Sequence, residues 1–209
     1  MSQPTLTDVL SEIMDDLDRP DLEPQIRRAV SAAVRRYQPD RFGFNEGFAT
    51  FLTIPGADVY GSGDAPAIPG FMAIDSAVLV DGDQTWPLKR IDEAMVEALD
   101  QPASASRPVA YSLLAKTLRL WPMPSEVWTI RLMGHLSLDL PPGDDDPSPW
   151  FGEARDLIMA RAKWHLALNV LKDANLKGAM DVMTADAFDT LRGRANVIAS
   201  TGQVQAWDC

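Results

Sequence analysis

The chain has 209 residues, of which 46% are hydrophobic and 23% charged, and its formal net charge is −11. A chain of this length can bury a sizeable core. It has no apolar run of about 18 residues for a membrane span and no secretory signal at its start, so we expect synthesis in a cytosol and no membrane partner. Its single cysteine cannot form an intrachain disulfide, and its acidic balance disfavours non-specific nucleic-acid binding.

Two amphipathic helices are predicted before residue 40. The first spans about residues 6 to 17, with Thr5 or Thr7 as its N-cap. The second begins after Asp21, which we expect to act as its cap, and ends before Pro39. Its arginines lie away from its apolar stripe, at positions Arg27, Arg28, Arg35 and Arg36.

The pattern changes to strand periodicity at about residue 46. Over 48–54, Phe48, Thr50, Leu52 and Ile54 alternate with Ala49, Phe51 and Thr53. A loop rich in proline and glycine follows at 55–72. A compact domain keeps such a long loop mainly for contacts. Two strands at 74–80 and 84–91 flank Asp81-Gly82-Asp83, which is a good hairpin signal.

The β-rich part continues with a short helix that Asp92 can cap. After a loop, a second hairpin is predicted with its turn near Ala115-Lys116. The segment from Val127 to Leu140 is predicted as the last and longest strand.

Two further helices are predicted after a break at 141–149. The break contains the run Asp144-Asp145-Asp146, which is more typical of a solvated loop than of a cation site. Ser148 can cap the next helix, which spans 150–172 and is apolar on most faces, as expected of a central helix. The last helix has one apolar face, formed by Leu176, Met180, Met183, Ala187, Leu191 and Ile198.

These elements predict an α+β fold with a helical bundle as its body. The body is discontinuous in sequence and takes in residues 1–45 and 147–200, and an antiparallel β-rich insertion occupies 46–146. Residues 201–209 are expected to form an extended C-terminal tail.

No catalytic, cofactor or metal site is predicted. His135 and His165 have no zinc-ligand spacing, and Gly61-Ser62-Gly63 lacks the frame of a nucleophile elbow. The 30 acidic residues form many carboxylate pairs by chance, so such pairs carry no signal. Five of the six tryptophans are expected in the core, whereas Trp207, in the tail, is expected to contact another chain or, alternatively, its own body.

The order of features resembles a known family. Asp40-Arg41-Phe42-Gly43-Phe44-Asn45-Glu46 follows an arginine-rich helix and precedes the strand Phe48-Ala49-Thr50-Phe51-Leu52-Thr53. Tyr111 and a hairpin come later, followed by Leu118-Arg119-Leu120-Trp121-Pro122-Met123-Pro124. From about residue 5 to 200 the chain is similar to the head-to-tail adaptor (tail tubular or head-completion connector) proteins of tailed bacteriophages, mainly the short-tailed ones.

The resemblance implies a structural virion protein without enzymatic activity, made in the cytoplasm of the host bacterium. Such proteins form a homo-oligomeric ring, typically a dodecamer, at the head–tail junction. Their partners are the portal protein and tail nozzle or tail fibre proteins, and DNA passes through the channel during ejection without specific binding. The acidic balance suits a channel to which DNA does not adhere, although it also favours solubility alone.

Three groups of contact residues are expected. Portal contacts are expected at Leu191, Ile198, Val204 and Trp207. Contacts of the 55–72 loop with the tail are expected at Tyr60, Ile68 and Phe71. Packing between subunits is expected at Arg27, Arg35 and Trp164.

Other protein classes remain open. They are a neck or stopper connector of a long-tailed phage, a cytosolic enzyme of unfamiliar type, and a general interaction module. Assembly into a ring would separate the structural classes from an enzyme.

Overall fold

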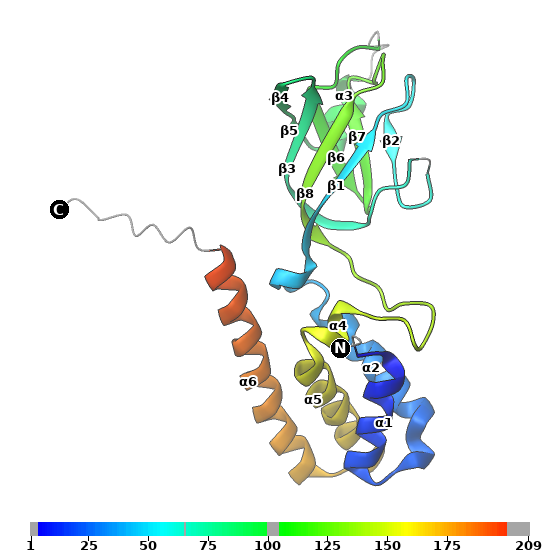
Figure 1. The fold of residues 1–209 in the computed structure, drawn as a ribbon, viewed down its shortest axis with the longest axis vertical. Coiled ribbons are helices and arrows are strands. Elements are labelled where there is room, and N and C mark those ends of the chain that lie inside the picture. Colours follow the sequence, from blue (N-terminus) through cyan, green and yellow to red (C-terminus); the bar gives the residue numbers. More distant parts are fainter. Residues whose placement is uncertain (1–3, 65, 100–104, 200–209) are drawn as a thin grey trace, which may run out of the picture. The chain divides into compact units, whose positions relative to one another are not determined.

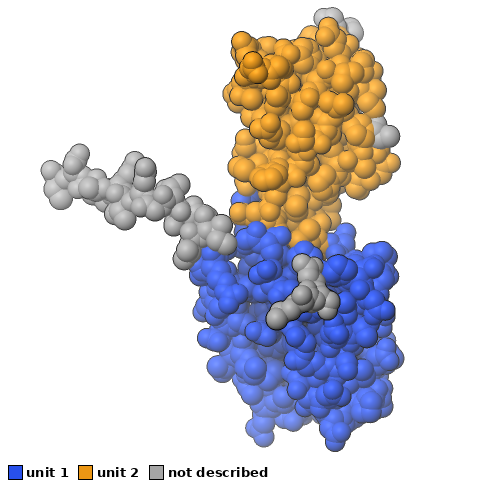
Figure 2. All heavy atoms as spheres, in the orientation of Figure 1, with its two compact units in different colours: residues 1–44, 139–209 blue, residues 45–138 orange. Residues whose placement is uncertain are grey.

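A computed structural model describes residues 4–64, 66–99 and 105–199. The chain divides into two compact units, which Figure 2 colours separately. The helical unit comprises Met1–Phe44 and Asp139–Cys209, and the β unit comprises Asn45–Leu138. The predicted α+β class is confirmed. The segment 139–146, which the sequence assigned to the β-rich insertion, belongs to the helical unit.

The helical unit is built from N-terminal and C-terminal helices, of which α6 is the longest (Figure 1). Its α-helices are α1 (Leu6–Leu17), α2 (Glu23–Tyr37), α4 (Pro149–Gly152), α5 (Arg155–Leu166) and α6 (Ala174–Ala199). Single turns of 3-10 helix occur at Pro20–Leu22 and Gly43–Asn45, and a π-helical turn at Ala167–Leu171 extends α5.

The two N-terminal helices begin in different ways. Thr5 caps α1 as predicted, because its hydroxyl accepts the Asp8 N–H while the Asp8 carboxylate accepts the Thr5 N–H. The predicted cap of α2, Asp21, is wrong. This residue lies in the 3-10 turn, and its carboxylate accepts two hydrogen bonds from Arg19 instead, at 2.7 and 2.8 Å.

The helix predicted over 150–172 is interrupted twice. Ser148 caps α4 as expected, but α4 ends at Gly152, a residue with low helix propensity, and α5 begins at Arg155. After α5 the backbone widens into the π-helical turn, where the Asn169 amide donates to the His165 carbonyl at 3.0 Å. Lys172 then ends the segment in the left-handed conformation, with φ at 55°.

The expected central helix is α5. It packs against α1, α2 and α6, and Figure 1 shows it between α6 and α1. Its buried residues are Leu157, Ile158, Met159, Ala160, Ala162 and Leu166. Along the seam with α1, Arg155 pairs with Glu12 and Lys163 pairs with Asp16. Apolar packing and exposed ion pairs therefore both join these helices.

The β unit contains two four-stranded sheets. Its strands are β1 (Glu46–Leu52), β2 (Val59–Tyr60), β3 (Phe71–Asp81), β4 (Gln84–Pro87), β5 (Lys89–Arg90), β6 (Ala110–Leu114), β7 (Thr117–Trp121) and β8 (Thr129–Leu136). One sheet has the order β1-β8-β3-β4 and the other β2-β7-β6-β5, with α3 (Glu93–Leu99) between β5 and β6 in sequence. All pairings are antiparallel except that of β5 with β6.

Both predicted hairpins are present. The turn between β3 and β4 has Gly82 at φ +56°, and the turn between β6 and β7 has Ala115 and Lys116 at φ 50° and 67°. Two consecutive left-handed residues match the right-handed twist of the flanking strands.

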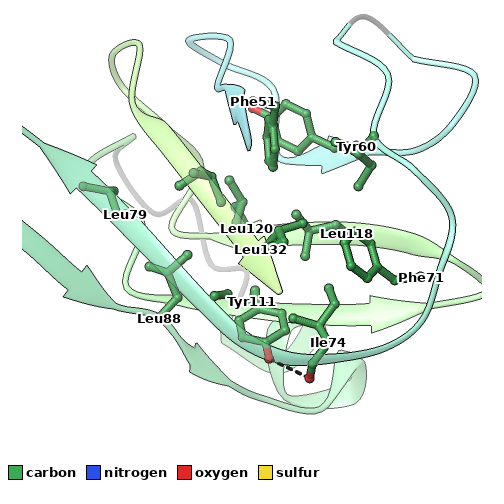
Figure 3. Packing of buried hydrophobic residues seen from close by; sticks show 13 residues of the cluster. Phe51, Tyr60, Phe71, Ile74, Leu79, Leu88, Tyr111, Leu118, Leu120 and Leu132 are labelled. Carbon is green, nitrogen blue, oxygen red and sulfur yellow. Dashed lines mark hydrogen bonds between the residues drawn. The ribbon is translucent and has the colours of Figure 1, made fainter. Parts of the chain in front are cut away.

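The core of the β unit lies between its two sheets (Figure 3). Apolar side chains from both sheets fill it, including Phe51, Phe71, Leu79, Leu118, Leu120, Ile130 and Leu132. The rings of Phe51 and Tyr60 lie 4.9 Å apart, and the Tyr111 hydroxyl donates to the Ile74 carbonyl at 3.5 Å. Residues distant in sequence therefore close the β unit around one apolar interior.

Candidate interaction surfaces

The described part of the chain offers several surfaces suited to binding. Within residues 4–64, 66–99 and 105–199, no group of three histidine, cysteine or acidic side chains could hold a metal ion. No helix in these same ranges is long and apolar enough to cross a membrane. His135, in β8, is buried, and His165 lies on α5, so the two histidines belong to separate units.

The loop at 55–72 contributes to the core of the β unit. Tyr60, Ile68 and Phe71, the expected tail contacts, are only 1%, 2% and 1% exposed. In the folded β unit these side chains fill the space between the sheets, which stabilises the unit by apolar burial. Their contact with the tail stays a prediction. The Tyr60 hydroxyl donates to the Ala57 carbonyl and accepts the Ile54 N–H, and burial raises the pKa of this phenol.

An exposed apolar surface lies instead on the outer face of the β1-β8-β3-β4 sheet. Phe48 is 76% exposed and stands opposite Met133, which is 49% exposed. Leu52, which is 55% exposed, lies on the same face of β1 as Phe48, because Phe48, Thr50 and Leu52 are alternate residues of this strand. We call this surface, formed by Phe48, Leu52, Val78, Val80 and Met133, the outer sheet face. Thr50, Thr129 and the exposed Arg131 lie between these apolar side chains, so the face combines apolar and polar groups, as protein interfaces commonly do.

A glycine shapes one end of the outer sheet face. A shallow cavity of about 280 Å³ lies there, lined by Phe48, Met133 and the backbone of Gly134. A Cβ atom at Gly134 would lie only 2.2 Å from the carbonyl oxygen of Ala73, so the close approach of β8 to β3 requires glycine.

The helical unit has a groove between the start of α5 and the C-terminal half of α6. Two cavities of about 240 and 260 Å³ share Glu153, Leu191 and Arg194 and so form one continuous depression. Apolar groups of its lining are Leu157, Ala160, Met183, Ala187 and Leu191. Three carboxylates surround them, from Glu153, Asp156 and Asp186. We call this depression the acidic groove.

Arginines form an exposed surface on α2. Arg28 and Arg35 lie seven residues apart, on the side opposite the buried stripe of this helix, and both are exposed. We call them the arginine face. Arg27 lies aside from it, because its guanidinium donates two hydrogen bonds to Asp144, at 2.6 and 2.8 Å.

The three residues expected to pack between subunits differ in their exposure and in their contacts within the chain. Arg35 is exposed, whereas Arg27 is engaged within its own chain. Trp164 packs within the helical unit, since the guanidinium carbon of Arg161 lies 3.9 Å and the ammonium nitrogen of Lys177 5.5 Å from its ring centroid. Contact between subunits stays a prediction for all three.

The expected portal contacts also lie in different places. Leu191 is 8% exposed and lines the acidic groove. Ile198 lies on α6, but its side chain falls outside the described residues, as do Val204 and Trp207 altogether. Their role toward the portal stays a prediction.

The loop with three aspartates is tied to the helices. Asp144 accepts the two hydrogen bonds from Arg27, and these lower the pKa of its carboxyl. Asp145 accepts a hydrogen bond from the Thr7 hydroxyl at 2.7 Å. Within the loop, the Asp146 carboxylate accepts a hydrogen bond from the Gly143 N–H. The loop is exposed as expected, but it also fastens α1 to α2.

Arg119 is a structural residue that the sequence did not single out. It projects from β7 and pairs with Asp58 at 2.8 Å, with Glu93 at 3.0 Å and with Glu97. The hydrogen bond with Asp58, followed by those with the two glutamates, raises its pKa. Its side chain is only 15% exposed, so it fastens α3 and the segment before β2 onto the sheet. A lone arginine within the apolar run Leu118–Trp121 was the available signal.

The first residues of the passage that carries the resemblance, through Phe44, belong to the helical unit. The Phe42 ring is buried and meets the edge of Trp150 at 6.2 Å, and Phe44 meets the same ring at 5.0 Å. The phenylalanines therefore hold the end of the N-terminal segment against α4.

Comparison with known protein families gives a match over nearly the whole chain. The sequence profile of a family described as SU10 adaptor protein matches residues 4–206, which include both units. No curated protein matches the chain significantly.

Proposed function

The chain belongs to the SU10 adaptor protein family, a family of phage head-to-tail adaptors, and on this basis we propose that it forms the ring that joins the portal to the tail. The observation that carries the proposal is the extent of the match, which takes in the helical unit, the β unit and the segments between them. As a phage adaptor the protein is a structural component of the virion.

The surfaces of the two units support this role. A ring subunit must contact its neighbours on two sides and other proteins above and below. The helical unit offers a charged pair of surfaces, the arginine face and the acidic groove, whereas the β unit offers the apolar outer sheet face. In our proposal the ring has twelve copies and binds the portal on one side. The outer sheet face meets the nozzle or fibre proteins of the tail.

The net charge supports a channel through which DNA passes. A formal charge of −11 per chain repels phosphate, so DNA would slide past a ring of such chains without adhering to it. In our proposal the ring recognises neither the sequence nor the shape of this DNA.

Negative-stain imaging of the protein mixed with portal rings tests the proposal. We expect the isolated protein to be monomeric or weakly associated, because charge interrupts its apolar surfaces and the portal template supplies the missing order. We also expect a second ring stacked coaxially on each portal. Portal rings alone and the adaptor alone are the controls. Bare portals beside single adaptor particles, under conditions in which the portal is intact, would overturn the proposal.

A truncation tests the proposed portal contact of the C-terminal segment. Deleting residues 203–209 removes Val204 and Trp207, and we expect weaker attachment to the portal at unchanged thermal stability. The matched control is Phe48→Ala, which alters the outer sheet face and should leave portal attachment intact. Unchanged attachment after the truncation would exclude this segment as the portal contact.

A further inference from the structure

The acidic groove has the chemistry of a docking site for a positively charged surface. Glu153, Asp156 and Asp186 make no ion pair with any described residue. They surround an apolar floor of buried Leu157, Ala160 and Leu191, beside which Met183 is 53% exposed. Arg194 is the one basic residue in the lining, so negative charge predominates. An occupant should therefore combine guanidinium or ammonium groups with an apolar stem.

The arginine face has the complementary chemistry. Arg28 and Arg35 project from two successive turns of α2, about 10 Å apart along the helix axis. Only the small side chain of Ala32 lies between them on this face. The face therefore presents two long apolar stems, each with a charged guanidinium at its end. Neither arginine makes an ion pair with a described residue, in contrast to Arg27 and Arg36.

One chain cannot bring these two surfaces together. The buried stripe of α2 packs toward α5, so Arg28 and Arg35 project away from the bundle. The groove opens between α5 and α6. Two different surfaces that match each other but cannot meet within one molecule generate a head-to-tail contact between copies, which closes into a ring when the rotation fits.

We propose that the arginine face of one copy docks in the acidic groove of the next, as the lateral contact of the ring. This inference rests on the proposed function for the ring itself and adds the residues and the charge chemistry of its repeating interface. Electrostatic contacts between exposed groups are weak singly and screened by salt, so the free protein associates weakly and the portal stabilises the closed ring.

A second acidic depression on the helical unit fits less well. It lies along α1, where Asp8, Glu12 and Asp15 line a cavity of about 400 Å³. Arg155 already pairs with Glu12 there, and the lining lacks the apolar groups of the acidic groove. Asp15 on this surface therefore provides a matched control for substitutions in the groove.

Charge reversal on both surfaces tests the proposal. The arginine-face variant carries Arg28→Glu and Arg35→Glu, and the groove variant carries Glu153→Arg and Asp186→Arg. Asp156 is kept, because it lies in the first turn of α5 and complements the helix dipole. Each variant alone should associate at least about tenfold more weakly than the wild type, because like charges then face each other.

An equimolar mixture of the two variants should associate again. The reversed face of one variant then meets the reversed groove of the other, and the remaining native face meets the native groove. Sedimentation at low ionic strength measures this association. The variants Asp15→Arg and Arg131→Glu reverse exposed charges elsewhere and should behave as the wild type. A mixture that associates no better than its components would overturn the proposal.

Disulfide trapping gives a measurement that does not depend on strong association. In a Cys209→Ser background, Arg35→Cys mixed with Asp186→Cys should form a disulfide between copies several-fold faster than Arg35→Cys mixed with Asp15→Cys. Equal rates would overturn the proposed contact. If the two cysteine pairs react at equal rates and the groove variant loses portal attachment, the groove binds the portal instead.

The two proposals can fail separately. Trapping and sedimentation use the adaptor alone, so they judge the contact between copies even if no ring forms on the portal. A ring on the portal with no difference between the two cysteine pairs would leave the proposed function in place and exclude this interface.

Discussion

In the helical unit, charged side chains join neighbouring elements at the surface, whereas in the β unit apolar side chains from both sheets fill the interior. Pairs such as Arg155 with Glu12 and Arg27 with Asp144 connect helices or loops of the helical unit over an apolar core. The segment 55–72 of the β unit corresponds to the aspartate loop of the helical unit, in that both connect other elements. It is fixed in place by the burial of Tyr60 and Ile68 instead of by ion pairs.

This difference predicts which substitutions each unit tolerates. Burial of apolar area contributes stability that salt hardly changes, whereas exposed ion pairs contribute little and are screened. The β unit should therefore be sensitive to changes inside it. The helical unit should tolerate changes of surface charge, which leaves charged surfaces such as the arginine face free to serve recognition.

The largest effect is expected from Tyr60→Ala. The change removes a ring packed on Phe51 and leaves a cavity, so the β unit should lose about 3–5 kcal/mol. Hydrogen exchange measured separately in the two units should rise in the β unit alone. The neighbouring Val59→Ala, at a side chain that is 46% exposed, should cost less than about 0.5 kcal/mol. Similar effects at both positions would contradict the burial of this loop.

The same substitution, glycine to alanine, can be made in each unit and compared. Gly134→Ala places a methyl group against the backbone of β3 and should destabilise the β unit by about 3 kcal/mol. Gly178→Ala on exposed α6 meets no atom within 4 Å and should stabilise the helix by up to about 1 kcal/mol. Urea unfolding measures both changes. Opposite signs are expected, and a neutral Gly134→Ala would show that β8 can move away from β3.

The elements could be predicted from the sequence because their signals are local. The Thr5 cap, the hairpin turn at Ala115-Lys116 and the break before Trp150 each depend on a few neighbouring residues, and each is present. The central position of α5 also followed from its apolar residues on most faces.

The roles of loop residues could not be predicted in the same way. Tyr60, Ile68 and Phe71 lie in a segment rich in proline and glycine, and only the meeting of two sheets, distant in sequence, provides the space that buries them. Arg27 and Asp144 are 117 residues apart, so their pairing depends on the fold that brings α2 to the loop. The Asp21 cap failed because a closer partner, Arg19, competes for its carboxylate.

Arg119 provides an intermediate case, since it is a charged residue of the β unit whose ion pairs connect α3 and the segment before β2 to the sheet. Arg119→Met would leave Asp58, Glu93 and Glu97 close together without a cation, and we expect a loss of about 2 kcal/mol, moderated by the partial exposure of the carboxylates. The loss should decrease in high salt, which screens the repulsion. Thermal unfolding at two salt concentrations measures it, with Arg131→Met on the exposed side of β8 as the control. A loss that is independent of salt would indicate packing rather than charge.

The smallest effect is expected from Asp144→Asn. Hydrogen bonds from Arg27 hold the pKa of Asp144 below its ordinary value of 3.8, so this carboxylate stabilises the folded state above that value, and the contribution is lost as the pH falls through the lowered pKa. Near neutral pH the wild type should melt slightly above Asp144→Asn, and the two melting temperatures should converge below pH 3.8. Asp186→Asn, which removes a carboxylate that makes no ion pair with a described residue, is the control and should melt near neutral pH as the wild type does. A difference between wild type and Asp144→Asn that persists at acid pH would mean that the loop is held by packing, as in the β unit, and not by this ion pair.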